Sequence, residues 1–191
     1  MAKNNLYKCL YCIIGASGSG KTSAADLLES KWRRRILKSY TTRPKRHEDD
    51  TDHTYITEEE YQALPDKVAT TEINGYHYCA TAEQIDKADY YVVDWEGFEQ
   101  LIQTYKGRKK SIHIIYLDCP REIREKRMEQ RGDDGEDIDV RITIDEWTFA
   151  DSYREKYKDY ILKTINTGNI TIGVVAGVIN AVAGKHDRKI K

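Results

Sequence analysis

Apolar runs and amphipathic segments alternate along most of the chain. Gly15 closes the first run, residues 6–14, and residues 21–31 place Ala24, Leu27 and Leu28 on one helical face. Later runs with the β-branched and aromatic composition of strands occupy residues 36–40, 90–94, 112–117 and 160–165. Because helical patterns separate most of these runs, the sequence predicts an α/β fold in which helices flank a parallel sheet.

Local signals mark where several helices begin. Thr57 and Glu60 have the spacing of a capping box. Thr81 and Gln84 repeat that spacing, and Pro120 favours the first turn of the helix that follows the run at 112–117. After residue 170, apolar positions recur at helical spacing and predict a closing amphipathic helix. The basic end, residues 185–191, is expected to be a frayed and solvated terminus.

Two segments interrupt the alternation. Between residues 41 and 87 the chain is polar and rich in tyrosine, and Asn74-Gly75 is a hairpin signal between the short runs 70–73 and 76–79. We therefore expect a small antiparallel insert. Residues 131–139 are rich in glycine and acidic side chains, which favours a mobile loop between two helices.

The charge balance excludes some classes of partner. The chain has 191 residues, with 31 Lys+Arg against 32 Asp+Glu and a formal net charge of -1. No overall field attracts nucleic acid or anionic lipid, so any anion site must be local. The longest apolar stretch, residues 170–183, is shorter than a bilayer span, and no signal peptide is recognisable. We expect a cytoplasmic monomer or homodimer that binds small molecules and neither nucleic acid nor membrane.

The cysteines do not have the spacing of a metal site. Only Cys9 and Cys12 are close, and no second pair of cysteines or histidines accompanies them. A strand would point these two side chains to opposite faces. We expect Cys9, Cys12, Cys79 and Cys119 to be buried thiols of a protein in a reducing compartment.

Residues 15–22, GASGSGKT, match the P-loop pattern, whose glycines turn backbone N–H groups toward phosphate oxygens. A strand pattern precedes the motif and a helix pattern follows it, which disfavours a glycine-rich turn without nucleotide. Lys21 would reach the β- and γ-phosphates, and the hydroxyl of Thr22 would bind Mg²⁺. The expected ATP-binding residues are Gly15, Ser17, Gly18, Ser19, Gly20, Lys21 and Thr22.

A second basic element follows. Arg43 and Arg46 lie three residues apart in a stretch that Pro44 keeps extended, so two guanidinium groups could grip one phosphate. In isolation, a solvated basic loop would explain this pair. Beside a P-loop, the pair favours a phosphoryl acceptor that carries its own phosphate.

These segments resemble the guanylate kinase family of nucleoside monophosphate kinases. The resemblance covers roughly residues 8 to 167 and includes the P-loop, residues 39–46, 52–57, 74–78 and 94–97, and the arginines that end at Arg131 and Arg141. It implies a P-loop core (residues 1–38, 89–126 and 142–191), an acceptor-binding insert (39–88) and a lid (127–141). The implied reaction is transfer of the ATP γ-phosphoryl group to GMP or dGMP with Mg²⁺.

The resemblance also implies roles for individual residues. Lys21, Arg127, Arg131 and Arg141 correspond to catalytic positions, and Asn166 to an ATP-binding one. The positions that match acceptor-binding residues are Ser39, Arg43, Arg46, Tyr55, Glu72, Tyr78 and Asp94.

Some positions depart from the family pattern. His53 stands where the family has a phosphate-binding tyrosine, and Tyr55 follows two residues later. Ala69, or Thr70 in a register shifted by one, occupies the place of a base-binding glutamate, and Glu72 lies three positions from the expected one. Glu72 could instead be a cross-strand charge on the insert, and Asp94 could instead cap a helix.

Other interpretations remain open. Asp94 and Gly97 fit the Asp-x-x-Gly element of GTPases, but the sequence has no Asn-Lys-x-Asp motif to recognise the base. Arg121 and Arg124 alternate with glutamates and are expected to form surface ion pairs. Alternative functions are a nucleotide-binding interaction module that has lost turnover and a monophosphate kinase with another base preference.

Overall fold

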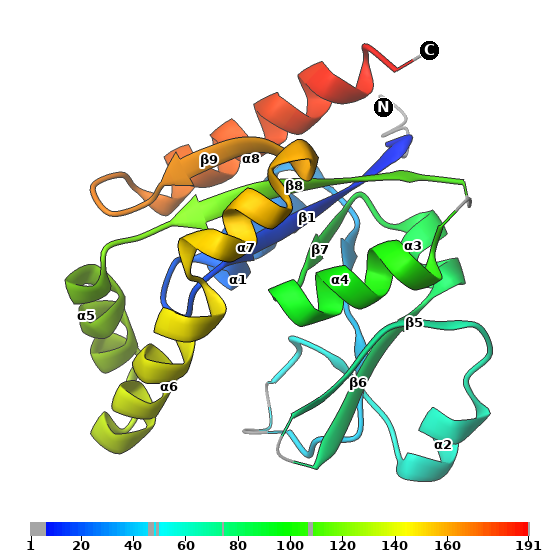
Figure 1. Ribbon diagram of the computed structural model, residues 1–191, viewed down its shortest axis with the longest axis horizontal. Helices are drawn as coiled ribbons and strands as arrows, with labels where there is room; N and C mark the ends of the chain where they lie inside the picture. The colour runs from blue at the N-terminus through cyan, green and yellow to red at the C-terminus, as the bar shows by residue number, and fades with distance from the viewer. Residues whose placement is uncertain (1–6, 46–47, 49, 74, 107–108, 191) are drawn as a thin grey trace.

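The computed structural model describes residues 7–45, 48, 50–73, 75–106 and 109–190 (Figure 1). A five-stranded parallel sheet forms its centre. Its strands, in order across the sheet, are β2 (Ile36–Leu37), β7 (Tyr90–Val92), β1 (Cys9–Gly15), β8 (Ser111–Asp118) and β9 (Ile161–Asn166). The predicted α/β class with a helix-flanked parallel sheet is therefore confirmed.

Alternation along β1 separates two apolar cores. Cys9, Tyr11 and Ile13 belong to the core beneath α1 (Lys21–Trp32) and α8 (Ile172–Asp187). Leu10, Cys12 and Ile14 point to the other face. That face is covered by α3 (Ala82–Lys87), α4 (Trp95–Thr104), α7 (Asp151–Lys156) and the 3₁₀ turn η1 (Lys158–Tyr160). Cys9 and Cys12 do point to opposite faces, and all four cysteines are buried and free, as predicted.

A second, smaller sheet lies below α4 (Figure 1). Its strands, in order across the sheet, are β4 (Thr54–Tyr55), β3 (Tyr40–Thr41), β6 (Tyr76–Thr81) and β5 (Lys67–Ile73). Along the chain, α2 (Glu58–Ala63) connects β4 to β5. β5 and β6 form the predicted antiparallel hairpin, although Asn74 of its turn lies outside the described residues. β3 and β4 are parallel, so the sheet is mixed rather than antiparallel throughout.

Both predicted capping boxes are present. The Thr57 backbone N–H donates to Glu60 over 2.8 Å, and the Glu60 N–H donates to the Thr57 hydroxyl over 3.2 Å. Thr81 and Gln84 make the same pair of bonds at the start of α3. Pro120 is the N-cap of α5 (Arg121–Arg131), one position before the first turn where we expected it.

Three sequence expectations need correction. Residues 36–40 do not form one strand but divide between β2 and β3 of different sheets, because an apolar run does not specify its pairing partner. Most of the expected loop at 131–139 is helical: Gly132 ends α5 at a φ of 85°, and Asp134 caps α6 (Gly135–Thr148). Residues 185–187 of the expected frayed end belong instead to α8, and the carboxylate of Asp187 accepts the backbone N–H of Lys8 over 2.7 Å.

Within the described segments, no helix is both long and apolar enough to cross a bilayer.

Candidate active site

The P-loop connects β1 to α1 and depends on glycine at close quarters. Gly18 has a φ of 74° and Gly20 a φ of 94°, both in the left-handed region. A Cβ atom on Gly18 would stand 2.7 Å from the carbonyl oxygen of Arg124, so no other residue fits there. Gly20 caps α1 without a side-chain hydrogen bond, which leaves the first amides of the helix available to an anion.

The side chain of Lys21 contacts the backbone of the P-loop. Its ammonium donates to the carbonyl oxygens of Gly15 over 2.6 Å and of Ala16 over 2.9 Å. Desolvation lowers the pKa of Lys21 to about 8, while the negative charges of Asp145 and Asp94 act in the opposite direction. The hydroxyl of Ser19 is buried and has no hydrogen-bond partner among the described residues. A desolvated cation, an unpartnered donor and open amides together fit a bound phosphate.

A cleft of about 830 Å³ opens in front of the P-loop. Residues of the P-loop, of α5 and α6 and of the turn after β9 line this cleft. Its lining includes Ser17, Gly18, Ser19, Gly20, Lys21, Thr22, Arg127, Arg131, Arg141 and Thr167. Most of the expected ATP-binding and lid residues therefore meet in one place.

Two expected ATP-binding residues are not part of this lining. Gly15 ends β1 and accepts the Lys21 ammonium through its carbonyl oxygen. The side chain of Asn166 accepts the backbone N–H of Gly168 over 2.9 Å, and the next residue, Thr167, faces the cleft instead. Sequence reasoning missed Thr167, whose hydroxyl donates to the carbonyl oxygen of Ser19 over 3.0 Å.

The lid arginines are held in two different ways. Arg127 donates to the backbone carbonyl oxygens of Gly18 over 3.3 Å and of Thr167 over 2.7 Å, so it fixes the P-loop against the turn after β9. Arg131 and Arg141 both pair with Asp133, with N–O distances of 2.9 Å and 3.1 Å. A single carboxylate thus gathers two guanidinium groups at the edge of the cleft, where a phosphate could replace it.

A buried ion pair supports the P-loop from behind. Arg124 and Asp145 are 2.9 Å apart, each with about 8% of its side chain exposed. Asp145 also accepts the backbone N–H of Ser17 over 2.8 Å. The expectation that Arg124 pairs with neighbouring glutamates at the surface is therefore wrong, because its partner comes from the next helix, α6. Arg121 does form the expected surface pairs, with Glu125 and Glu146.

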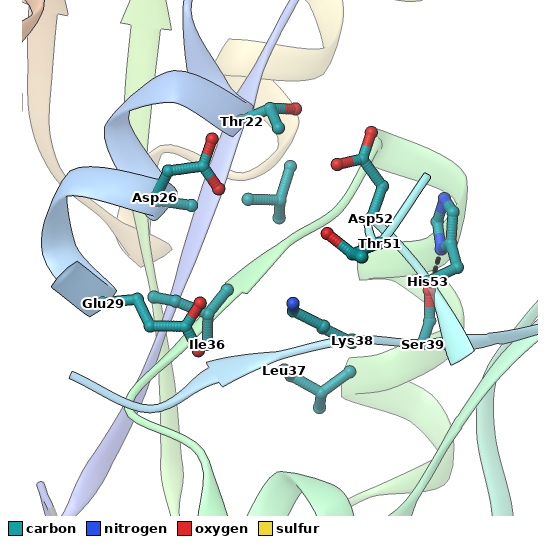
Figure 2. A pocket seen from close by; sticks show the side chains of 12 residues that line it. Thr22, Asp26, Glu29, Ile36, Leu37, Lys38, Ser39, Thr51, Asp52 and His53 are labelled. Atoms are coloured by element: carbon teal, nitrogen blue, oxygen red, sulfur yellow. Dashed lines mark hydrogen bonds between the residues drawn. The ribbon is translucent and has the colours of Figure 1, made fainter. Parts of the chain in front are cut away.

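A second, smaller cavity of about 110 Å³ lies between α1 and the segments around β2 and β4 (Figure 2). Asp26 and Glu29 of α1 border it, and at its other end the Ser39 hydroxyl and Nδ1 of His53 share a hydrogen bond of 2.9 Å. Burial, together with the charges of Asp52 and Glu29, raises the pKa of Asp26. Thr22, Asp52 and His53 line both this cavity and the P-loop cleft, so the two spaces adjoin.

Several expected acceptor-binding residues lie close together beside this cavity without lining it. Arg43 donates to Asp50 and to the hydroxyl of Tyr55, each over 3.2 Å. Burial raises the pKa of Tyr55 to about 12. The ring of Tyr78 lies 5.4 Å from that of His53. Arg46 lies outside the described residues.

The two carboxylates expected to recognise the base are elsewhere. Glu72 faces His77 across the hairpin at 4.0 Å and is exposed, which fits the cross-strand interpretation. Asp94 accepts the backbone N–H of Gly97 over 2.7 Å and caps α4, at the carboxyl end of β7. Neither residue is among those that line the two cavities.

Comparisons with known proteins agree with this geometry. Residues 12–157 match the AAA domain family. A guanylate kinase of Nitrosomonas europaea is 30% identical over 138 residues, which cover 66% of this chain and 67% of that protein. The crystal structure of a gluconokinase from Sinorhizobium meliloti 1021 superposes with a TM-score of 0.55 over 97% of both chains at 10% identity, a likeness of fold alone. The chain therefore belongs to the AAA domain family of P-loop proteins and, among the kinases of that type, to the guanylate kinase family.

Proposed function

We propose that this protein transfers the γ-phosphoryl group of ATP to a nucleoside 5′-monophosphate, and that GMP or dGMP is the acceptor. The observation that carries the proposal is the pair of adjoining cavities, which share Thr22, Asp52 and His53. A donor phosphate on the P-loop and an acceptor in the smaller cavity would meet at this shared wall. Phosphoryl transfer requires such an approach, because positioning and charge neutralisation supply most of the catalysis.

The residues around the P-loop suit the donor side. Lys21 would hold the β- and γ-phosphates, and the desolvated ammonium would interact with them more strongly than in water. Thr22 at the start of α1 is the residue that would bind Mg²⁺, which supplies neutralisation of phosphate charge. Arg131 and Arg141 would leave Asp133 for the transferring group, and Arg127 would keep the loop in place.

The acceptor side would be formed by the smaller sheet. We propose residues 39–88 as the acceptor-binding insert and residues 127–141 as the lid. Arg43 with Tyr55, and Arg46 beside them, would bind the acceptor phosphate, with Asp50 giving up part of its contact to Arg43. The packing of β5 against α4 would transmit movement of the insert to the central sheet.

Guanine suits the charges of the small cavity. Its N1–H and N2–H₂ donors lie on one edge, and a carboxylate can accept from both, whereas adenine presents an acceptor at N1. Asp26, Glu29 and Asp52 all border this cavity, and burial raises the pKa of Asp26, which marks its carboxylate as partly desolvated. We therefore propose that Asp26 contacts the base in addition to Ser39, while the roles expected for Glu72 and Asp94 stay predictions.

An assay of ADP release tests this function. The acceptors are GMP, dGMP, AMP, dTMP, UMP and CMP, with gluconate included because of the structural neighbour's name. Guanine nucleotides should have the highest kcat/KM, and Asp26→Asn should lower that preference. The exposed carboxylate of Glu83, which pairs with Lys87, provides the control, and Glu83→Gln should leave the preference unchanged. If a pyrimidine nucleotide is preferred, the protein is a monophosphate kinase of another specificity. If no acceptor in the panel leads to ADP release, the result favours the nucleotide-binding interaction module.

A further inference from the structure

A cluster of metal-binding side chains lies at the end of the central sheet that is opposite to the P-loop. Cys9 begins β1, His113 lies near the start of β8, and His186 belongs to the last turn of α8. The last turn of α8 lies beside the start of β1 (Figure 1). One potential ligand atom from each of these three residues lies within 4.8 Å of the other two.

The hydrogen bonds around His186 determine which of its nitrogens can bind a metal. The Tyr11 hydroxyl donates its only proton to the carbonyl oxygen of Ala183 over 3.0 Å. Its oxygen can therefore only accept from Nδ1 of His186, which lies 3.1 Å away. This contact places the proton on Nδ1 and leaves the lone pair of Nε2 for a metal, the arrangement by which second-shell groups orient a ligating histidine.

The environment of His113 is a second, independent indication of a metal site. The Nδ1 atom of this histidine is buried and has no hydrogen-bond partner among the described residues. Its ring lies 4.3 Å from that of His186. A buried nitrogen without a partner is costly, and a metal ion would provide one.

Cys9 would have to lose its thiol proton to bind a metal ion, and burial opposes that loss. Burial raises the pKa of the Cys9 thiol, and the carboxylate of Asp187 acts in the same direction. The ammonium groups of Lys110 and Lys8 act in the opposite direction. A bound dication would add a stronger positive charge than either lysine, and binding would release the thiol proton to solvent.

We propose that Cys9, His113 and His186 form a binding site for one Zn²⁺ ion that ties the end of α8 to the central sheet. One thiolate and two neutral imidazoles are donors typical of zinc rather than of Mg²⁺. Three protein ligands leave a fourth position for water. The half-buried exposure of the two histidines gives the ion a path from solvent. The site shares no residue with the P-loop cleft or the small cavity.

Zinc titration of the nucleotide-free protein tests this site. Isothermal titration should give one Zn²⁺ per chain, and Cys9→Ser, His113→Gln and His186→Gln should each weaken binding by more than about tenfold, since even second-shell changes cost that much. Cys12→Ser is the matched control, because this buried thiol lies on the same strand and points to the other face. Its affinity for zinc should equal that of the wild type.

Cobalt provides a spectroscopic readout for the same ligands. Co²⁺ in the wild-type protein should show a thiolate-to-metal charge-transfer band that is absent in Cys9→Ser and present in Cys12→Ser. Zinc should raise the melting temperature of the wild type but not of His186→Gln, whose half-exposed position makes it the variant that retains its fold. Absence of stoichiometric zinc binding, or equal binding by wild type and His186→Gln, would overturn the proposal. Lys21→Ala, which should lose phosphoryl transfer, should bind zinc with the affinity of the wild type.

Discussion

Arg124 and Asp145 form a buried ion pair between α5 and α6, and the same carboxylate accepts the backbone N–H of Ser17 in the P-loop. The helices α5 and α6 and the P-loop therefore share one charged contact. Because breaking a buried pair leaves an uncompensated charge, this contact should determine both stability and ATP binding.

Asp145→Asn should destabilise the protein by about 3 kcal/mol or more, because Arg124 stays buried without a counter-charge. The KM for ATP should rise as well, since Ser17 loses part of its support. Urea unfolding gives the stability, and the adjacent exposed residue Glu146 provides the control. Glu146→Gln should cost less than about 1 kcal/mol; equal losses in the two variants would show that burial of the pair does not matter.

Lys21→Ala should remove nearly all phosphoryl transfer, because the change deletes the cation that offsets charge on the transferring group. Its melting temperature without nucleotide should change little, because the desolvation that lowers the pKa of the ammonium offsets the two hydrogen bonds lost at Gly15 and Ala16. Lys31→Ala, at the other end of α1, is the control. Retention of more than about a tenth of the activity, which corresponds to about 1.4 kcal/mol, would contradict the assigned role.

ATP binding should weaken at alkaline pH. The pKa of Lys21 is about 8 in the nucleotide-free protein, and bound phosphates raise it, so binding favours the protonated amine. Affinity for a non-hydrolysable ATP analogue should be flat below about pH 8 and decrease above it. Lys21→Arg, whose guanidinium stays protonated, should lose this dependence. The same decline in both proteins would assign it to another group.

Arg43→Ala should raise the KM of the acceptor steeply and leave the KM of ATP unchanged, because Arg43 follows β3 of the smaller sheet and contacts Tyr55 of β4. Arg131→Ala should mainly lower kcat. Steady-state kinetics with each substrate varied in turn measures both effects, and Arg121→Ala is the surface control. Thermal unfolding must accompany the assay, because Asp50 loses a contact in the first variant. A change in ATP KM alone would contradict the separation of roles.

Local patterns were sufficient for the parts of the fold that local forces determine. The β1 alternation, the P-loop and the two capping boxes all depend on residues within a few positions of one another. The division of residues 36–40 between two sheets could not be predicted, because pairing with β7 or β6 is decided by distant residues. The helix at Gly135 was missed because an acidic, glycine-containing segment resembles a loop, although Asp134 is a good N-cap.

The site was predictable where one motif contains its residues, and less so where it depends on tertiary contacts. Lys21 and Thr22 were found from the P-loop alone. Arg124 was misjudged because its partner, Asp145, comes from another helix. Cys9 was interpreted only through its neighbour Cys12, while His113 and His186 lie far along the chain. No short-range spacing indicates such a cluster.

The most direct test of the proposed reaction follows the label of [γ-³²P]ATP in the presence of Mg²⁺ and GMP. We expect the wild type to place the label in GDP, the transfer to stop without GMP, and Lys21→Ala to place almost no label in GDP. Label that appears only in inorganic phosphate, or that stays in ATP with every nucleoside monophosphate offered, would contradict transfer between the two adjoining cavities.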